Sequence, residues 1–400
     1  MWRKRFDLGE DCYMAKAIQN PIRVMRVIAR MNIGGPAVQV AELIRGLNPV
    51  EFDQRLYTGF CDSNEADYVD TVATDLKVFR IDGFGRRVSL YRDFKALITV
   101  VIEIRRFKPH VIHTHTFKAG FLGRIASIIS LHPSLRVHTF HGHLLNGYFS
   151  PLKRSIIIIA EKTLAMFTSE LLAVGDKVRQ DLLQAGIGTI EKFGLMPPGL
   201  VVGPLTSKVE AQKSLGLAVG QLQCAFIGRV TQIKRPDRFL NVVSEIKKRG
   251  IEMNFFIAGD GDQLETCRKR IVNESLPVNI LGWQSNIEKV LSAADIVVLT
   301  SDNEGTPLSL IQGGMAGLAV VTTNVGSIPE IVLNGTTGII TTTDVQEIAN
   351  AIEKISNDKN YRMLLGAAAK KFTLSKFGVK RLVLDHENLY KKLVSSQAKS

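Results

Sequence analysis

Residues 294–332 read ADIVVLTSDNEGTPLSLIQGGMAGLAVVTTNVGSIPEIV, and this stretch decides the fold. Its apolar run Ile296–Leu299 predicts a buried parallel strand. A polar turn over Ser301–Thr306 follows, and we expect a helix to begin at Pro307, because proline fits the first helical turn. A strand that leads through a glycine turn into a helix presents free backbone N–H groups to an anion. The stretch therefore predicts an α/β domain with a phosphate site.

Glu304 stands at the mouth of this predicted phosphate site. Its carboxylate would repel an anion, so we expect it to hold a different part of the ligand, such as the hydroxyl groups of a sugar. Phosphate and sugar hydroxyls at one place indicate a nucleotide sugar.

The composition is that of a globular protein with two domains. The chain has 400 residues, of which 45% are hydrophobic and 22% charged, which excludes a disordered chain. Its four cysteines are scattered without a C-x-x-C pair, so we expect neither disulfides nor zinc, and a reducing cytosol is the default location. No apolar run approaches the roughly 18 residues that a spanning helix needs. The first 20 residues lack the apolar core of a signal peptide, and we expect a disordered leader.

The net charge of +13 is unevenly distributed. Between Lys77 and Arg136 there are twelve Lys and Arg residues and three acids. We expect no nucleic-acid partner, because interleaved aromatic residues and a recognised binding module are missing. A solvated helical face and an anionic membrane surface, where each basic side chain contributes about 1 kcal/mol, stay open as interpretations.

Short β-rich runs alternate with amphipathic segments from residue 22 onward, which predicts α/β structure with parallel strands. In the first half we expect strands at Ile22–Ala29, Gln54–Phe60, His110–Thr114, Arg136–Phe140 and Leu171–Val174. The helices between them are expected at Val38–Leu47, Leu90–Arg106, Ala119–Ser130 and Leu152–Phe167. After the breaker cluster Met196–Gly199 the alternation restarts, with strands expected at Cys224–Gly228, Asn254–Ala258, Val278–Gly282, Ile296–Leu299, Ala319–Thr322 and Gly338–Thr341.

We therefore predict two Rossmann-like, doubly wound parallel-sheet domains that face each other across a cleft. Ligands should bind at the carboxyl ends of the strands. The expected divisions are a leader over residues 1–20, a first domain over 21–198, a second domain over 199–378 and a C-terminal helix over 379–400.

Three turns at predicted strand ends carry candidate site residues. Gly34 and Gly35 follow the first strand, where glycine permits unusual φ angles and a helix start favours an anion. Lys118 lies at another strand-to-helix turn and is a candidate for an acceptor phosphate. Arg229 and Lys234 follow the first strand of the second domain, where two cations could stabilise the charge of a departing phosphoryl group.

Seven of the eight histidines fall between His110 and His143. His113 and His115 should point to one side of a strand end, but cysteines and paired carboxylates are missing nearby in sequence, so we expect no metal. His141 follows a strand and precedes Gly142, which should bring it to the cleft. A packed histidine bonded to backbone is the alternative for His141, whereas His138 is expected in the core or behind the site.

These blocks together resemble the retaining glycosyltransferases of family 4, which have the GT-B fold. The donor pattern of that family is S-x-x-E-G-x-P, with a second Glu eight residues after the first. The match covers Ser301, Glu304, Gly305, Pro307, Gly317 and Val325–Glu330. At the position of the second acid this chain has Gln312, and Gly313-Gly314 follow where the family usually has good helix formers. The histidine blocks are similar to bacterial enzymes that build capsule, O-antigen or exopolysaccharide on a lipid diphosphate carrier.

The resemblance implies a role for each candidate. The leaving diphosphate would be held by two cations and the following helix start, that is, by Arg229, Lys234, Gly305, Thr306, Pro307 and Leu308. Glu304 would bind hydroxyls of the transferred sugar, Gln312 the ribose, and His141 would help to position sugar and acceptor. The loop at Gly34 and Gly35 would lie near both substrates, and the last helix, over Lys380–Leu393, would cross back to the first domain.

The expected function is metal-independent, retaining transfer of a hexose or N-acetylhexosamine. The donor would be a nucleoside diphosphate sugar, expected to be UDP-linked, and the acceptor a lipid-linked molecule or a glycan. No cofactor is expected besides this co-substrate, and the expected location is cytoplasmic, with peripheral attachment to the inner face of the membrane left open. Two other classes also stay open: a nucleotide-sugar epimerase of the same fold, and a non-catalytic homologue that binds a glycan or a partner.

Overall fold

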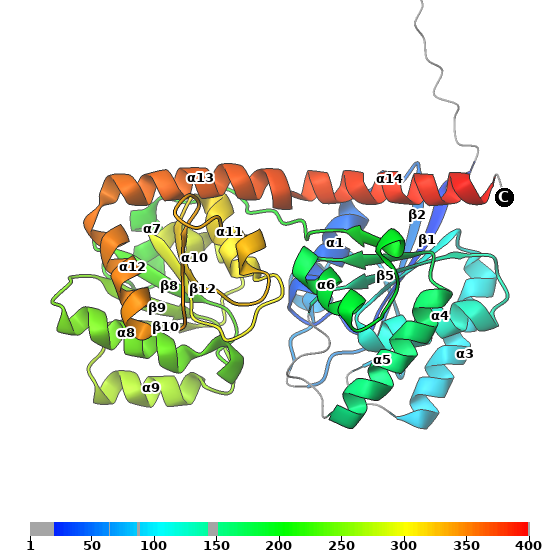
Figure 1. The fold of residues 1–400 in the computed structure, drawn as a ribbon, viewed down its shortest axis with the longest axis horizontal. Coiled ribbons are helices and arrows are strands. Elements are labelled where there is room, and N and C mark those ends of the chain that lie inside the picture. Colours follow the sequence, from blue (N-terminus) through cyan, green and yellow to red (C-terminus); the bar gives the residue numbers. More distant parts are fainter. Residues whose placement is uncertain (1–19, 64, 86–88, 143–150, 399–400) are drawn as a thin grey trace, which may run out of the picture.

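The computed structural model describes residues 20–63, 65–85, 89–142 and 151–398. These residues form two α/β domains that lie beside each other, with the last two helices running along both (Figure 1). The leader predicted over residues 1–20 lies outside the described residues, except for Asn20.

Within the described residues, the first domain contains a sheet of seven parallel strands in the order β3-β2-β1-β4-β5-β6-β7. The strands are β1 (Ile22–Ile28), β2 (Phe52–Thr58), β3 (Val78–Arg80), β4 (Val111–His115), β5 (Leu135–Phe140), β6 (Glu170–Ala173) and β7 (Phe193–Leu195). The helices are α1 (Gly35–Gly46), α2 (Tyr68–Thr71), α3 (Leu90–Phe107), α4 (Phe117–Ile129), α5 (Pro151–Met166) and α6 (Asp176–Gln184).

The second domain contains a sheet of six parallel strands in the order β10-β9-β8-β11-β12-β13, again counted over the described part of the chain. The strands are β8 (Gln223–Ile227), β9 (Asn254–Ala258), β10 (Val278–Gly282), β11 (Ile296–Leu299), β12 (Ala319–Thr323) and β13 (Ile339–Thr341). Its helices are α7 (Lys208–Ser214), α8 (Pro236–Lys248), α9 (Leu264–Asn273), α10 (Ile287–Ala293), α11 (Leu308–Ala316), α12 (Val345–Asn357) and α13 (Lys359–Phe377). The last helix, α14 (Val379–Gln397), follows α13 and returns to the first domain.

This architecture confirms the predicted pair of doubly wound parallel sheets. In each sheet the strand order reverses once, between β1 and β4 in the first domain and between β8 and β11 in the second. Ligands of open α/β sheets bind at the carboxyl ends of the strands next to such a reversal. We therefore expect one binding edge at the ends of β1 and β4 in the first domain, and another at the ends of β8 and β11 in the second.

Three short elements of the first domain, β3, β7 and α6, were not predicted from the sequence. The three-residue strands β3 and β7 lie at the edges of the first sheet, where half-buried side chains give no apolar run. Helix α6 is nine residues long, and its mean hydropathy is low, so its few buried residues, Val178 and Leu182, show little periodicity. The helix expected at Pro307 begins instead at Leu308, because Pro307 keeps an extended ψ of 109° and serves as the N-cap residue.

Alternate residues of the central strands pack into opposite layers of the core. In β8, Cys224 and Phe226 join one apolar cluster beneath α8 and α12. Ala225 and Ile227 face the other way, into a cluster that includes Leu310 of α11. Both faces of the sheet are thus buried, which explains why its strands read as continuous apolar runs.

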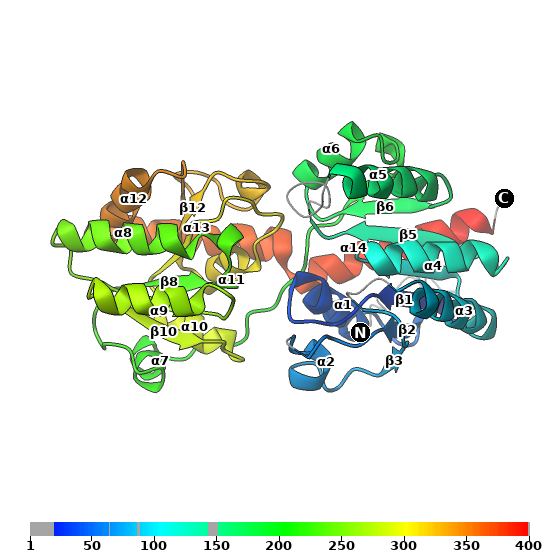
Figure 2. The same cartoon turned by 90° about the horizontal axis from the view of Figure 1, so that it is seen from below.

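The chain passes between the domains at two places that lie side by side. Leu200 N donates to Phe377 O at 2.8 Å, next to the start of α14. Helix α14 then lies along the first domain, where Leu382 and Tyr390 are buried with Ile22 and Val24 of β1. Figure 2, seen from below, shows α14 running behind α1 and β5 on its way to the C-terminus. The last helix therefore completes the core of the first domain, although it follows the second in sequence.

Packing explains the Gly313-Gly314 pair inside α11. A Cβ added at Gly313 would lie 2.9 Å from Val297 Cγ2 of β11, and one added at Gly314 would lie 2.6 Å from Thr373 Cγ2 of α13. Real Cβ atoms do not approach other atoms so closely. The two glycines therefore let α11 pack tightly against the sheet on one side and against α13 on the other.

We predict that Gly314→Ala destabilises the protein by about 1–3 kcal/mol through overpacking. This loss outweighs the gain of about 1 kcal/mol that alanine brings to a helix interior. Adding Thr373→Ser removes the Cγ2 atom that alanine would meet while keeping the hydroxyl that bonds to Ala369 O. Urea unfolding of the single and double variants measures this coupling. Additive effects of the two substitutions would rule out the contact as the reason for glycine.

Candidate functional site

The carboxylate of Glu304 is the centre of the candidate site. It lies in the turn between β11 and α11, and only 7% of the residue is exposed. Lys234 Nζ lies 2.5 Å from Glu304 Oε1, and Ser301 Oγ donates to the same oxygen, also at 2.5 Å. Two separate segments of the sequence, predicted individually, are thus brought together at one carboxylate.

The backbone of Glu304 is fixed from the opposite side by the loop that follows β12. Ser327 N donates to Glu304 O at 3.1 Å. Gly326 has a φ of +56°, and a Cβ at this position would lie 1.8 Å from Glu304 O. Any side chain at residue 326 would therefore push the loop away from Glu304.

Side-chain and backbone bonds join the Lys234 segment to the Glu304 turn. Thr300 Oγ1 donates to Lys234 O at 3.1 Å. Asp302 pairs with Arg235 at 3.0 Å and with Arg238 at 2.8 Å, which anchors the turn to α8. The Lys234–Glu304 pair is therefore held by neighbours on both sides rather than by its own contact alone.

Arg229 lies just after β8 and is exposed. Among the described residues, its guanidinium makes no hydrogen bond or ion pair. Its charge is therefore available to an anion at the edge where β8 and β11 end.

Two helix N-termini from different domains come together at this edge. A Cβ placed on Gly35, the first residue of α1, would lie 3.7 Å from Leu308 Cδ1, the first residue of α11. Both N-termini carry partial positive charge and free N–H groups. Gly34 does not use the unusual φ angles that glycine permits, since its φ of 168° is ordinary extended backbone. Thr306 Oγ1, beside the start of α11, is buried and has no hydrogen-bond partner in the described part of the chain.

Gln312 lies one helical turn after Leu308 on α11 and is half-buried. Residues four apart on a helix share a face, so Gln312 lies on the side of α11 that approaches the first domain. The structure brings Lys234, Glu304 and the α11 start together, with Gln312 one turn further along.

A second contact between the domains lies at Glu330, inside the V-G-x-x-P-E block. Asp176 N and Lys177 N, the first two residues of α6, donate to its carboxylate at 2.7 and 2.8 Å. The N-cap residue Gly175 has no side chain to do this, so Glu330 caps the helix from the other domain. No pattern in the sequence could have paired these two segments.

His141 directly follows β5 and contacts His115, the last residue of β4. His115 Nδ1 and His141 Nε2 are 3.0 Å apart, so one donates to the other. Burial lowers the pKa of His141 to about 3 and that of His115 well below its ordinary value. Both rings are therefore neutral at physiological pH. Within the described residues Nδ1 of His141 has no hydrogen-bond partner, so it is available to a substrate.

Behind this pair, a buried polar network reaches to the C-terminal helix. His113 Nδ1 is 2.6 Å from Tyr390 Oη, and His113 Nε2 is 2.7 Å from Thr139 Oγ1. Arg26 Nη1 donates to the same Tyr390 hydroxyl at 3.0 Å. His386 stacks on His113 with ring centroids 5.6 Å apart. Tyr390 and His386 come from α14 and lie far from the other members in sequence, so no sequence pattern indicates that they belong to this network.

Lys118 is held in the first domain by neighbours of its own. Its Nζ lies 2.7 Å from Asp93 Oδ1 and donates to Gly83 O at 3.0 Å. A phosphate ligand would have to compete with this ion pair. His138 is buried in the core and bonds to Thr114 Oγ1 at 2.8 Å.

Within the described ranges, no cluster of His, Cys, Asp and Glu is suited to hold a metal ion. In the same part of the chain, no helix combines the length and the apolar character that crossing a membrane requires.

Two family models match this chain, one in each domain. The model described as glycosyl transferase 4-like domain matches residues 34–199. The model described as glycosyl transferases group 1 matches residues 207–372.

Two relatives of this chain are named as glycosyltransferases, and a solved structure shares its fold. The chain is 27% identical over 307 residues to the UDP-Gal:α-D-GlcNAc-diphosphoundecaprenol α-1,3-galactosyltransferase of Escherichia coli, covering 73% of this chain and 77% of that protein. It is 21% identical over 326 residues to the capsular polysaccharide biosynthesis glycosyltransferase CapM of Staphylococcus aureus, covering 79% and 85%. The crystal structure of Anabaena Alr3699/HepE in complex with UDP aligns with a TM-score of 0.78 and 19% identity, over 92% of this chain and all of that one.

The buried histidines predict acid sensitivity. Burial lowers the pKa of His113, His115, His138 and His386 below the ordinary value, and each is at most 1% exposed. The unfolded chain takes up protons near pH 6.5 while the folded chain does not, so stability is full above that pH and falls below it. Each such histidine contributes a slope of about 1.4 kcal/mol per pH unit well below pH 6.5.

Urea unfolding between pH 7 and 5 measures this slope. His386→Leu removes one of the histidines, so it should reduce the slope by up to about 1.4 kcal/mol per pH unit. A free energy of unfolding that stays constant over this range would contradict neutral, buried histidines.

Removing Lys234 should destabilise the fold, because its side chain is only 17% exposed and its partner Glu304 is buried. A fully exposed lysine in a loop would contribute little to stability, but Lys234 is not such a lysine. We expect Lys234→Ala to lower the free energy of unfolding by about 1–3 kcal/mol and Glu304→Gln to restore part of this loss in the double variant.

The matched control is Lys95→Ala, whose pair with Asp82 is more than half exposed and 3.8 Å long. Urea unfolding should show a change below about 0.5 kcal/mol for this control. An equal loss in both single variants would mean that the Lys234–Glu304 pair carries no special weight.

Proposed function

Because the chain belongs to the GT-B glycosyltransferases of the family 4 type, we propose that it is a retaining enzyme that uses a UDP-linked sugar as donor. The acceptor is a lipid-linked diphosphate or a growing glycan, and the product contributes to a surface polysaccharide. The observation that carries this proposal is the buried Glu304 carboxylate, paired with Lys234 at the N-terminus of α11.

The charges suit a donor with two ends of different chemistry. Lys234, Arg229 and the free N–H groups at the start of α11 attract the diphosphate. Glu304 repels phosphate but accepts hydrogen bonds from sugar hydroxyls, so it orients the donor with its sugar towards the carboxylate. As the bond to the leaving diphosphate breaks, negative charge grows where these cations already stand, which lowers the barrier.

The enzyme acts without a metal ion in this proposal, because Lys234 and Arg229 supply the positive charge that a divalent cation would otherwise supply. Retention then follows a front-face path, in which the acceptor attacks from the side where the diphosphate departs. Glu304 is bonded to Lys234 and Ser301, so a role in binding hydroxyls suits it better than a role as a covalent nucleophile. His141 is neutral and offers Nδ1 to position the acceptor or the sugar by a hydrogen bond.

The choice of donor and acceptor is supported by similar proteins. The Escherichia coli relative is named for a UDP-sugar donor and a diphosphoundecaprenol acceptor. The Anabaena neighbour was crystallised with UDP. A lipid diphosphate acceptor lies in a membrane, so we propose that the enzyme works in the cytoplasm, attached peripherally to the inner face of the cell membrane.

Gln312 provides the test of the proposed donor orientation. A carboxylate accepts from both hydroxyls of a ribose, whereas an amide offers one acceptor oxygen and one NH₂ group. Gln312→Glu should strengthen this contact by about 1–2 kcal/mol, which is roughly a 5- to 30-fold gain in UDP-sugar affinity. Turnover at saturating donor should barely change, since ribose contacts are the same in ground and transition states. Titration calorimetry measures the affinity.

Two further variants complete the test. Glu304→Ala should lower turnover at saturating donor, because its contacts lie on the transferred sugar. Gln346→Glu makes the same chemical change on α12, at an exposed residue bonded to Arg249, and should leave donor affinity unchanged. If Gln312→Glu leaves donor affinity unchanged or lowers it, Gln312 does not face the ribose.

A further inference from the structure

Three consecutive helices, α3, α4 and α5, lie beside one another on the first domain (Figures 1 and 2). Helix α4 begins two residues after His115, the last residue of β4. Because helices of this fold start at the carboxyl edge of the sheet, this helical layer extends away from the edge that carries His141.

Helix α5 turns an apolar stripe towards solvent. Leu152, Ile156, Ile159 and Met166 are all exposed, Ile156 by 59% and Ile159 by 65%. Their spacing of three, four and seven residues places them on one side of the helix. Helix α3 carries a similar exposed stripe, made of Tyr91, Phe94, Ile98 and Ile102.

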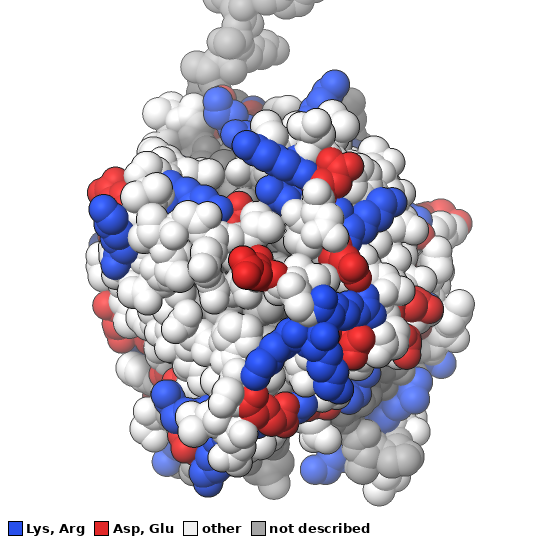
Figure 3. All heavy atoms as spheres, turned by 90° about the vertical axis from the view of Figure 1, so that its left-hand side faces the viewer, with Lys and Arg blue, Asp and Glu red and all other residues white. Residues whose placement is uncertain are grey.

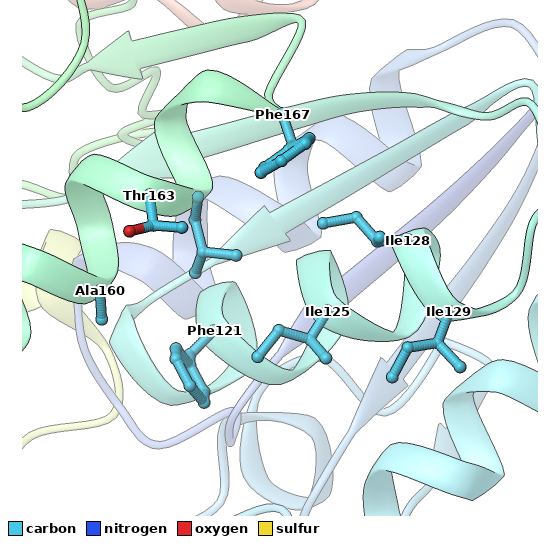
Figure 4. Close-up of a pocket in the computed structure, with 8 residues that line it drawn as sticks. Phe121, Ile125, Ile128, Ile129, Ala160, Thr163 and Phe167 are labelled. Atoms are coloured by element: carbon cyan, nitrogen blue, oxygen red, sulfur yellow. The ribbon is translucent and has the colours of Figure 1, made fainter.

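An apolar groove of about 350 Å³ lies between α4 and α5. Figure 4 shows side chains of both helices along it. Its lining contains no charged residue and consists mainly of Phe121, Ile125, Ile128, Ile129, Leu164 and Phe167. Beneath the groove, Arg124 of α4 and Glu161 of α5 form a buried ion pair at 2.7 Å, which holds the two helices together.

The charge of this layer is strongly basic. The three helices carry nine Lys and Arg residues and three acids. Each acid is paired within the layer: Asp93 with Lys118, Glu103 with Arg106, and Glu161 with Arg124. Exposed cations are left over, among them Arg92, Arg105, Lys153 and Arg154. The end of the second domain differs, since acidic and basic side chains are interspersed over it (Figure 3).

We infer that the α3–α4–α5 face lies on an anionic lipid bilayer, with the α5 stripe and the α4–α5 groove in contact with acyl chains and the cations at the lipid phosphates. Apolar residues on one side and Lys and Arg beside them are the features of helices that lie in a membrane interface. This inference rests on the proposed attachment to the membrane and names the surface that makes it. A second copy of the chain suits the face less well, because a two-fold dimer would set this basic surface against itself.

The test uses the full-length chain and two kinds of vesicle. Wild-type protein should sediment with vesicles of phosphatidylglycerol and phosphatidylcholine and much less with phosphatidylcholine alone. Ile156→Ser with Ile159→Ser should weaken this binding by at least about tenfold, and Lys153→Gln with Arg154→Gln by about tenfold at low salt. The control pair Met363→Ser and Leu364→Ser changes residues on α13 that are 61% and 69% exposed, and it should bind as the wild type does.

Binding of UDP, followed by calorimetry, separates this inference from the proposed function. Variants that lose vesicles but keep UDP affinity would support the surface. Wild-type protein that binds vesicles but no UDP would overturn the proposed function and leave the surface standing. The surface is overturned if the α5 variants bind vesicles like the wild type, if the wild type does not bind anionic vesicles, or if sedimentation shows a dimer that the Ile156 and Ile159 substitutions dissociate.

Discussion

The ion pair between Lys234 and Glu304 sets the geometry of the second domain's binding edge. A buried carboxylate is costly unless it is paired and hydrogen-bonded, and Lys234 and Ser301 meet that need at 2.5 Å each. Hydrogen bonds and ion pairs of Thr300, Asp302 and Ser327 hold the loops of Lys234 and Glu304 in place, so the pair is formed before any ligand arrives. A preorganised cation beside a buried carboxylate suits a ligand that carries both phosphate and hydroxyl groups.

The connection between the domains depends on similar long-range pairs. Glu330 of the second domain caps α6 of the first, and Leu308 of α11 approaches Gly35 of α1. Helix α14 closes the first domain's core and places Tyr390 and His386 behind the histidines at the ends of β4 and β5. A change in how α14 packs would therefore reach His141 through His113 and its stacked neighbour His115. Helix α14 thus links the connection between the domains to the histidines at the ends of β4 and β5.

The fold could be predicted from sequence patterns because these patterns follow from local interactions along the chain. Apolar runs such as Ile296–Leu299 mark strands buried on both faces, and turns such as Gly305–Pro307 mark helix starts. The same patterns brought Lys234 and Glu304 into one predicted site through the family resemblance. They could not pair Glu330 with α6 or Tyr390 with His113, because those partners are 154 and 277 residues apart and each looks ordinary in its own segment. They also gave no reason for Gly313-Gly314, which the structure explains by close packing against β11 and α13.

In the proposed function, the edge formed by Lys234, Glu304 and the start of α11 binds a nucleoside diphosphate sugar, and the bond between the sugar and the diphosphate is cleaved there. The most direct measurement is a screen of UDP-, GDP- and ADP-sugars against the wild-type protein, with thermal shift and release of the free nucleoside diphosphate as readouts. We expect a UDP-sugar to raise the melting temperature and to be slowly hydrolysed, with UDP released and no epimer formed from the donor alone. Stabilisation by none of these donors, or conversion of a donor into its epimer without release of UDP, would contradict this expectation.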